Sequence, residues 1–193
     1  MQTAAKINAA KIKEAYNRRE LIDGQEIMMS PPPLIRHRQV QFNLSGKLYN
    51  FLRGKRCRAF VETLVFFDAE NHCIPDVLVV CDKNKIKRTH IEGAPDFIAE
   101  ILSPSTRKYD LGKKKDIYEK YGVKEYWVID PADETVDTYI RQNDKLVLDN
   151  SYHNYSQEDW EWLDDTDKAD IKLTLKLSLY DDLEFDIKEL FEE

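Results

Sequence analysis

The stretch from residue 95 to 131 constrains the fold most, because it sets a lysine-rich helix between two apolar strands. It reads "PDFIAEILSPSTRKYDLGKKKDIYEKYGVKEYWVIDP". Its apolar ends, "FIAEIL" and "EYWVID", are short enough to predict strands. Ser105 or Thr106 can cap the intervening helix, and Gly122 can end it. Strand, helix and strand therefore follow one another without a long linker.

The rest of the chain adds strands and helices on both sides of this unit. The strand predicted in "IPDVLVVC" is apolar on both faces, as in the interior of a covered sheet. Together the elements predict an α/β fold in which helices flank a mixed central sheet, a three-layer α/β/α sandwich. We expect an N-terminal helix in residues 1–18, from about Ala4 to Asn17, and a single domain in residues 19–193. The other expected elements are a hairpin turning at Asp23-Gly24, a helix over 34–52, a strand in "CRAFVETLVFF", a hairpin in "ETVDTYIRQNDKLVL", an outer strand in "IKLTLKLSL" and a final helix in "DIKELFEE".

The net charge of −7 is unevenly distributed along the chain. Residues 157–193 carry 14 acids and 4 bases, whereas residues 36–115 carry 16 bases and 9 acids. The acidic total argues against nucleic acid as a partner, but the second segment could form a basic face. Charge runs are also typical of ordinary solvated surface, so both interpretations stay open.

The apolar residues are too scattered for a membrane span, since no run approaches the ~18 residues required. The N-terminal segment also lacks the apolar centre of a signal peptide, so we expect a cytoplasmic protein without a membrane partner. Cys57, Cys73 and Cys81 lack the close-paired spacing of a zinc site. We expect them to be buried as small apolar residues.

The helix after residue 106 directs one of its three consecutive lysines toward the core. At about 100° per residue, Lys114 lies near the centre of the apolar stripe, while Lys113 and Lys115 fall to either side. The remaining members of this stripe are Leu111, Ile117, Tyr118 and Tyr121.

Two acidic residues occupy positions that predict burial. Asp76 opens the apolar run "VLVV", and Glu100 shares a strand face with its apolar neighbours two residues away on each side. An isolated buried carboxylate is costly unless a cation or several hydrogen-bond donors compensate it. A structural pair of Glu100 with Lys114, and a turn capped by Asp76, is one interpretation. A divalent cation is the other, because Mg²⁺ typically takes one or two protein carboxylates together with water and phosphate oxygens.

The order of these residues along the chain resembles the PD-(D/E)XK nuclease superfamily, whose fold is a mixed sheet between helices. The matching residues are Pro75-Asp76 and then Glu100-Ile101-Leu102. More closely, the chain from about Arg19 onward resembles the Uma-two family of restriction-endonuclease-like proteins. The segments that carry this likeness are "RELIDGQEIMMSPP", "IPDVLVV", the whole stretch 95–131 and "LEFDIKELF".

The resemblance implies a DNA endonuclease that uses Mg²⁺ or Mn²⁺. Asp76 and Glu100 would hold the metal, with the backbone carbonyl of Ile101 as a further ligand. Leu102 stands where the superfamily pattern has its lysine, and Lys114 on the following helix matches the displaced lysine of this family.

Two further positions match the family, Glu20 and His37. The resemblance implies that Glu20 completes the metal site and that His37 contacts the scissile phosphate, although each could equally be an ordinary surface residue. Asp110 lies one turn before Lys114 and could pair with it. Tyr118 is interpreted as core. An aromatic group is expected to pack the last strands or a partner subunit, namely Tyr152, Tyr155, Trp160 and Trp162.

Three hypotheses follow from these residues. The first is a metal-dependent nuclease that acts on DNA, with a homodimer or loops supplying any sequence specificity. The second is a nuclease-fold protein with little or no catalysis that binds DNA or a protein partner. The third is a structural domain in which the buried charges pair without metal.

Overall fold

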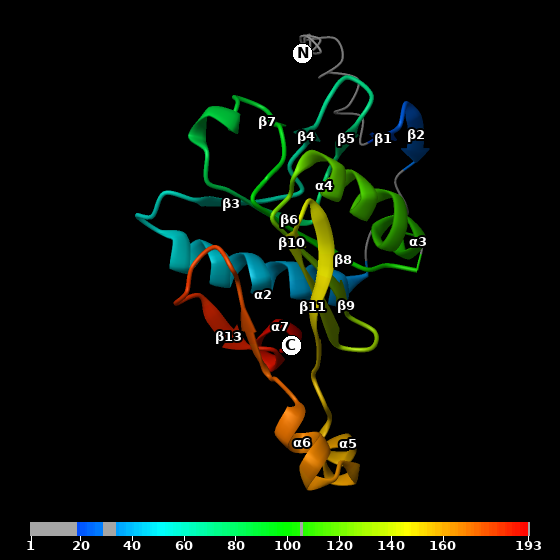
Figure 1. The fold of residues 1–193 in the computed structure, drawn as a ribbon, viewed down its shortest axis with the longest axis vertical. Coiled ribbons are helices and arrows are strands. Elements are labelled where there is room, and N and C mark those ends of the chain that lie inside the picture. The colour runs from blue at the N-terminus through cyan, green and yellow to red at the C-terminus, as the bar shows by residue number, and fades with distance from the viewer. Residues whose placement is uncertain (1–18, 29–33, 105, 193) are drawn as a thin grey trace.

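The computed structural model describes residues 19–28, 34–104 and 106–192 (Figure 1). The predicted helix in residues 1–18 lies outside the described residues. Within the described part of the chain, no helix is both long and apolar enough to cross a membrane.

A six-stranded mixed sheet forms the centre of the molecule, as predicted. Its strand order is β11-β10-β9-β8-β6-β3. β8 and β9 pair in parallel because the lysine helix crosses over between them, and the other pairs are antiparallel. The strands are β3 (Arg58–Val61), β6 (Val77–Val80), β8 (Phe97–Ile101), β9 (Glu125–Asp130), β10 (Thr135–Gln142) and β11 (Lys145–His153).

Helices cover both faces of this sheet, which makes the three layers expected from the sequence. α2 (Ile35–Leu52) crosses the middle of the molecule and buries Val40, Leu44 and Leu48 against one face (Figure 1). The second face packs against the lysine helix, which consists of α3 (Arg107–Tyr109), a π-helical turn η2 (Asp110–Lys114) and α4 (Lys115–Tyr121). Alternate residues of β6 enter the two cores, so the strand is buried on both sides.

A second sheet was not predicted. Its strand order is β2-β1-β5-β4-β7, and its strands are mostly too short to leave a periodic pattern. The hairpin at Asp23-Gly24 is confirmed, and both turn residues have positive φ, of 50° and 73°. The strands are β1 (Arg19–Ile22), β2 (Gln25–Met28), β4 (Val65–Phe66), β5 (His72–Cys73) and β7 (Ile91–Glu92), and a short 3-10 helix η1 (Lys83–Lys85) precedes β7.

The C-terminal region differs from the expectation of an outer strand. β12 (Thr174–Lys176) pairs only with β13 (Glu184–Asp186) in a separate ribbon, and α7 (Lys188–Phe191) follows it. Because Leu175 and Leu177 are buried beneath α2, their alternation reflects packing on the core rather than membership of the main sheet.

Two short helices, α5 (Gln157–Trp162) and α6 (Asp165–Asp170), project from one end of the molecule (Figure 1). They were not predicted. Of the aromatic group, Tyr152 is buried in the core, Tyr155 and Trp160 contact each other with ring centroids 6.0 Å apart, and Trp162 is 85% exposed. Tyr155 also stacks on His153 at the end of β11, so packing on the last strands is confirmed for Tyr152 and Tyr155, and packing on a partner subunit stays a prediction.

Cysteine pairing corrects the expectation of three buried free thiols. Cys57 and Cys81 form a disulfide, whereas Cys73 is free and buried. The antiparallel pairing of Arg58 with Val80 brings the residue before Arg58 opposite the residue after Val80, which places Cys57 and Cys81 within bonding reach. Their separation of 24 residues gave no sequence signal of this pairing.

Replacement of this disulfide by Cys57→Ser/Cys81→Ser should lower the free energy of unfolding by about 3 kcal/mol, because the unfolded chain loses a closed loop. Chemical denaturation without reductant measures the change. Adding reductant should destabilise the wild type by a similar amount and leave the double variant unaffected. Three titratable thiols in the unreduced, denatured wild type would contradict the bond.

Candidate active site

Asp76 and Glu100 leave adjacent strands at the same level of the main sheet. β6 and β8 pair antiparallel with Val77 opposite Ala99, so the residue before Val77 lies beside the residue after Ala99. The backbone N–H of Ile101 donates to Asp76 Oδ2 at 2.7 Å. The β8 backbone thereby fixes the Asp76 carboxylate next to Glu100.

The first turns of α2 hold Asp76 from the other side. His37 Nε2 lies 3.2 Å from Asp76 Oδ1, and the Gln41 side-chain amide donates to the Asp76 carbonyl oxygen at 3.0 Å. His37 and Gln41 are four residues apart and so share one helix face. The His37 ring is buried, and its Nδ1 has no hydrogen-bond partner among the described residues.

Lys114 lies at the centre of three carboxylates. Its Nζ is 3.1 Å from Glu20 Oε1, 3.2 Å from Glu100 Oε1 and 3.2 Å from Asp110 Oδ1, and the residue is only 5% exposed. The contact with Asp110 is an ion pair without hydrogen-bond geometry. Three buried carboxylates therefore share one ammonium group, which leaves an excess of negative charge.

The π-helical turn determines how Lys114 reaches this cluster. The wider turn from Asp110 to Lys114 brings both of its end residues to the buried side. Leu111, predicted on the same stripe, is instead 41% exposed, because the stripe assumes an uninterrupted α-helix and the π-helical turn changes which residues face the core. Insertions of this kind occur frequently at functional sites. Lys113 is exposed and Lys115 half-buried, as their sideways positions predicted.

The second sheet supplies Glu20. β1 pairs with the hairpin strand β2 on one side and with β5 on the other, which carries Glu20 over the lysine helix. Glu20 Oε1 accepts a hydrogen bond from the backbone N–H of Ile74 at 2.9 Å, and Lys114 approaches the same oxygen. The prediction of Glu20 depended on the family resemblance, since a short hairpin strand carries little pattern of its own.

Two tyrosines complete the cluster. Tyr118 is buried, as its interpretation as core predicted, and its hydroxyl donates to Glu100 Oε1 at 2.5 Å. The Tyr126 hydroxyl donates to the Asp110 carbonyl oxygen at 2.9 Å. The contact of Tyr118 with Glu100 was missed, although its place one turn after Lys114 on the same face was a usable signal.

The pKa values in the cluster reflect its burial. Burial raises the pKa of Glu100 well above its ordinary value, because the opposing attraction of Lys114 is too weak to offset it. Burial likewise raises the pKa of Asp110. Burial disfavours the charged form of Lys114, but the three carboxylates dominate and raise its pKa well above the ordinary value. The cluster therefore favours uptake of a proton or of a cation.

The carboxylates of Asp76 and Glu100 have the chemistry to bind a divalent metal ion. Asp76 and Glu100 offer hard carboxylate oxygens from adjacent strands. The carboxylates of Asp110, Asp76 and Glu20 make the electrostatic potential at Glu100 more negative. Two carboxylates suit Mg²⁺, which keeps several water ligands. The described residues contain no group of three or more His, Cys, Asp and Glu side chains placed to hold a metal. The residues therefore fit an ion that is bound mainly by two carboxylates and water.

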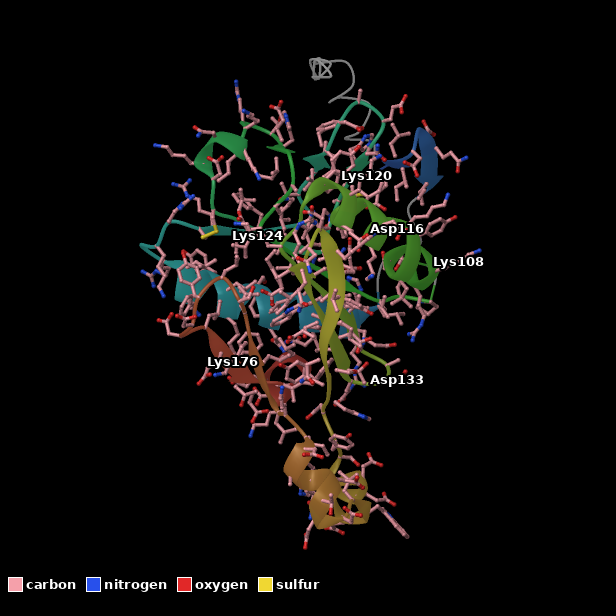
Figure 2. All side chains as sticks on the ribbon, viewed as in Figure 1. Lys108, Asp116, Lys120, Lys124, Asp133 and Lys176 are labelled. Carbon is pink, nitrogen blue, oxygen red and sulfur yellow. A yellow bond between two sulfur atoms is a disulfide. The ribbon has the colours of Figure 1, made fainter. Side chains whose placement is uncertain are left out.

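Three arginines around this cluster each have an acidic partner. Arg36 and Arg38 flank His37 and form ion pairs with Glu134 and Glu62. A third pair joins the exposed Arg107 of α3 to Asp130 at the end of β9. Figure 2 shows Lys108 pointing outward from the same helix. A phosphate backbone would have to replace some of these acidic partners.

The mixed sheet between helices, with the paired acids on two adjacent inner strands, places the chain among proteins of nuclease-like fold. A solved structure described as "a putative nuclease belonging to DUF820", from Anabaena variabilis, superposes with a TM-score of 0.69 at 24% identity, covering 90% of this chain and 89% of that one. The Uma2 family model, described as "Putative restriction endonuclease", matches residues 9–176. The chain belongs to this family.

Three related proteins are described as uncharacterized. One from Synechocystis is 30% identical over 65% of this chain and 67% of its own length, and another from the same organism is 27% identical over 70% and 79%. A protein of Methanocaldococcus jannaschii described as an ATP-binding protein is 28% identical over 66% of this chain and 55% of its own length.

Proposed function

We propose that this protein is a metal-dependent endonuclease that hydrolyses phosphodiester bonds in DNA. The observation that carries the proposal is the pair of carboxylates, Asp76 and Glu100, set beside each other with Lys114 in contact with Glu100. Membership of the Uma2 family and the nuclease-like fold support a nuclease.

Asp76 and Glu100 would hold Mg²⁺ or Mn²⁺, with the Ile101 carbonyl as a further ligand. A bound divalent ion supplies an activated water and stabilises charge on the leaving oxygen. The backbone N–H of Ile101 and the His37 ring orient Asp76, and Tyr118 orients Glu100. These contacts hold the two carboxylates in place without a metal.

Lys114 contacts Glu100 and so supplies a positive charge beside the proposed metal position. Its charge offsets negative charge that develops on the phosphorus oxygens, and contact with Glu20 and Asp110 keeps it protonated and oriented. His37 acts from the start of α2 through its contact with Asp76, and its buried Nδ1 would have to be uncovered before it could meet the scissile phosphate. Glu20 has a positioning role, because it orients Lys114 and adds negative charge near Glu100.

A second candidate is a nuclease-fold protein that binds DNA without cutting it. The ion pairs of Lys114 favour this candidate, because a lysine that is bound by three carboxylates is not readily available to bind a phosphate. The predicted homodimer stays a prediction, since the structure contains a single chain.

Metal removal tests the proposal. The wild type should cut supercoiled plasmid or labelled single- and double-stranded oligonucleotides with Mg²⁺ or Mn²⁺, and chelator should reduce cleavage to background. Asp76→Asn should be as inactive as the chelated wild type, which excludes a contaminating nuclease. Retention of DNA without cleavage under every metal condition would favour the second candidate. Absence of both would remove nucleic acid as the substrate.

A further inference from the structure

We propose that a hollow lined by four basic residues at the far end of the sheet binds a small molecule that carries a diphosphate group. The hollow holds about 450 Å³ and is here called the basic hollow. This volume lies in the range of small-molecule sites. The proposal is independent of the nuclease activity. The basic residues are Lys55, Arg56, Arg58 and Lys83.

The basic hollow is separate from the candidate active site. Cys81, which lines it, follows the last residue of β6, whereas Asp76 precedes the first. Five residues of extended strand span roughly 16 Å. Lys55 comes after the last turn of α2, and His37 belongs to its first turn. Figure 1 shows these two ends of α2 on opposite sides of the molecule. One phosphate could not contact both sites.

Contacts within the chain hold two of the four exposed basic side chains, Arg56 and Lys55, before any ligand binds. Arg56 Nε donates to the Cys81 carbonyl oxygen at 2.9 Å, which leaves the terminal nitrogens of its guanidinium for other partners. Lys55 Nζ lies 3.2 Å from the centroid of the Phe51 ring. Arg58 belongs to β3, whose pairing with β6 is reinforced by the disulfide, the yellow bond in Figure 2. Positioning of this kind lowers the entropy cost of binding.

The charge of the basic hollow is not balanced by its own lining. Asp82 is its only acidic lining residue, and Asp82 Oδ1 already accepts a hydrogen bond from the Asn84 backbone N–H at 2.9 Å. Within the described part of the chain, Arg58 and Lys83 have no ion-pair partner, in contrast to Arg36 and Arg38 near the active site.

The chemistry of these side chains matches phosphate. Arginine presents a planar fork that binds phosphate oxygens in pairs, and lysine adds a point charge. Lys55 already pairs with Asp182, but the other three cations have no ion-pair partner among the described residues and exceed what a single carboxylate or monophosphate requires. A diphosphate distributes its charge over two groups and can contact cations from both β3 and the segment after β6, so it is the ligand group that fits best.

Titration calorimetry with inorganic pyrophosphate, on protein stripped of metal by a chelating resin, tests this site. We expect saturable binding with a Kd below about 1 mM at low salt. Arg58→Ala/Lys83→Ala should weaken binding at least about tenfold. The matched control, Lys168→Ala/Lys172→Ala, makes the same change in net charge far from the basic hollow and should bind as the wild type does.

Each alternative outcome overturns the proposal. Absence of saturable binding shows that the basic hollow is ordinary solvated surface. Equal weakening in the control variant shows attraction to the overall field rather than to a site. Loss of binding in Asp76→Asn locates the pyrophosphate at the candidate active site. Amide chemical shifts of Lys83 and Asn84 report the location directly, even if the double variant is less stable.

Discussion

Glu100→Gln is expected to abolish metal-dependent cleavage, by a factor of a thousand or more, while making the metal-free protein more stable. The loss follows because an amide is a poor replacement for one of the two carboxylates that we propose as metal ligands. The gain in stability follows because three carboxylates compete for Lys114 in the wild type. The substitution removes Glu100, the carboxylate whose pKa is raised well above its ordinary value. Replacement of a buried charge of this kind can stabilise by about 1 kcal/mol or more.

This gain in stability should depend on pH. Because the folded-state pKa of Glu100 is raised, its contribution to stability is fully present below the unfolded pKa and is lost as pH rises through the folded value. The wild type should therefore lose stability over that interval, and Glu100→Gln should lose less. Denaturation curves of both proteins in steps from pH 5 to 9 measure the difference.

Glu125→Gln is the matched control. Glu125 is equally buried on the neighbouring strand, but it accepts hydrogen bonds from the Trp127 indole and from the Ser178 backbone and hydroxyl. An amide cannot accept all three, so this variant should be less stable. Added Mn²⁺ should raise the melting temperature of the wild type and of Glu125→Gln but not that of Glu100→Gln. Equal Mn²⁺ responses in all three proteins would exclude Glu100 as a ligand.

Lys114→Met should lower the free energy of unfolding by about 3–5 kcal/mol, because it leaves three buried carboxylates without their common cation. It should also abolish cleavage under conditions where circular dichroism shows it folded. Lys113→Met and Lys115→Met serve as controls, because neither side chain is fully buried. They should keep wild-type stability to within about 0.5 kcal/mol.

The deficit of Lys114→Met should shrink at low pH, because protonation of the carboxylates removes the unpaired charge. A deficit that is the same at pH 5 and pH 8 would show that lost packing, rather than lost charge, destabilises the variant. Unchanged cleavage by the folded variant would assign Lys114 to structure alone. If all three lysine variants cut equally, the catalytic role of this helix is wrong.

The parts of the fold that could be predicted are those with a regular period. Three elements repeat their apolar residues often enough to be recognised. They are the helix over 34–52, the buried strand before Cys81 and the hairpin of β10 and β11. Strands of two residues, such as β4 and β5, carry no period, so the second sheet could not be predicted. The protruding pair α5 and α6 buries no residue and left no apolar pattern.

Prediction of the candidate site succeeded where a charged residue interrupted an apolar pattern. Asp76, Glu100 and Lys114 were each found in this way, and their burial is as expected except that Asp76 is only partly covered. Glu20 and His37 had no such pattern and depended on the family resemblance. The pairing of Asp110 with Lys114, expected from their spacing of one turn, is confirmed, whereas the π-helical turn between them was not predicted.

The wide spacing of the cluster along the chain has a consequence for synthesis of the protein. Glu20 comes from the first described strand, Glu100 from β8, and Lys114 from a helix whose packing face is completed only by residues near Tyr126. Contacts of such long sequence separation form slowly during folding. A ribosome-bound chain that has not yet emerged beyond β9 therefore cannot assemble the buried charges, so the cluster around Lys114 matures only after most of the molecule has left the ribosome.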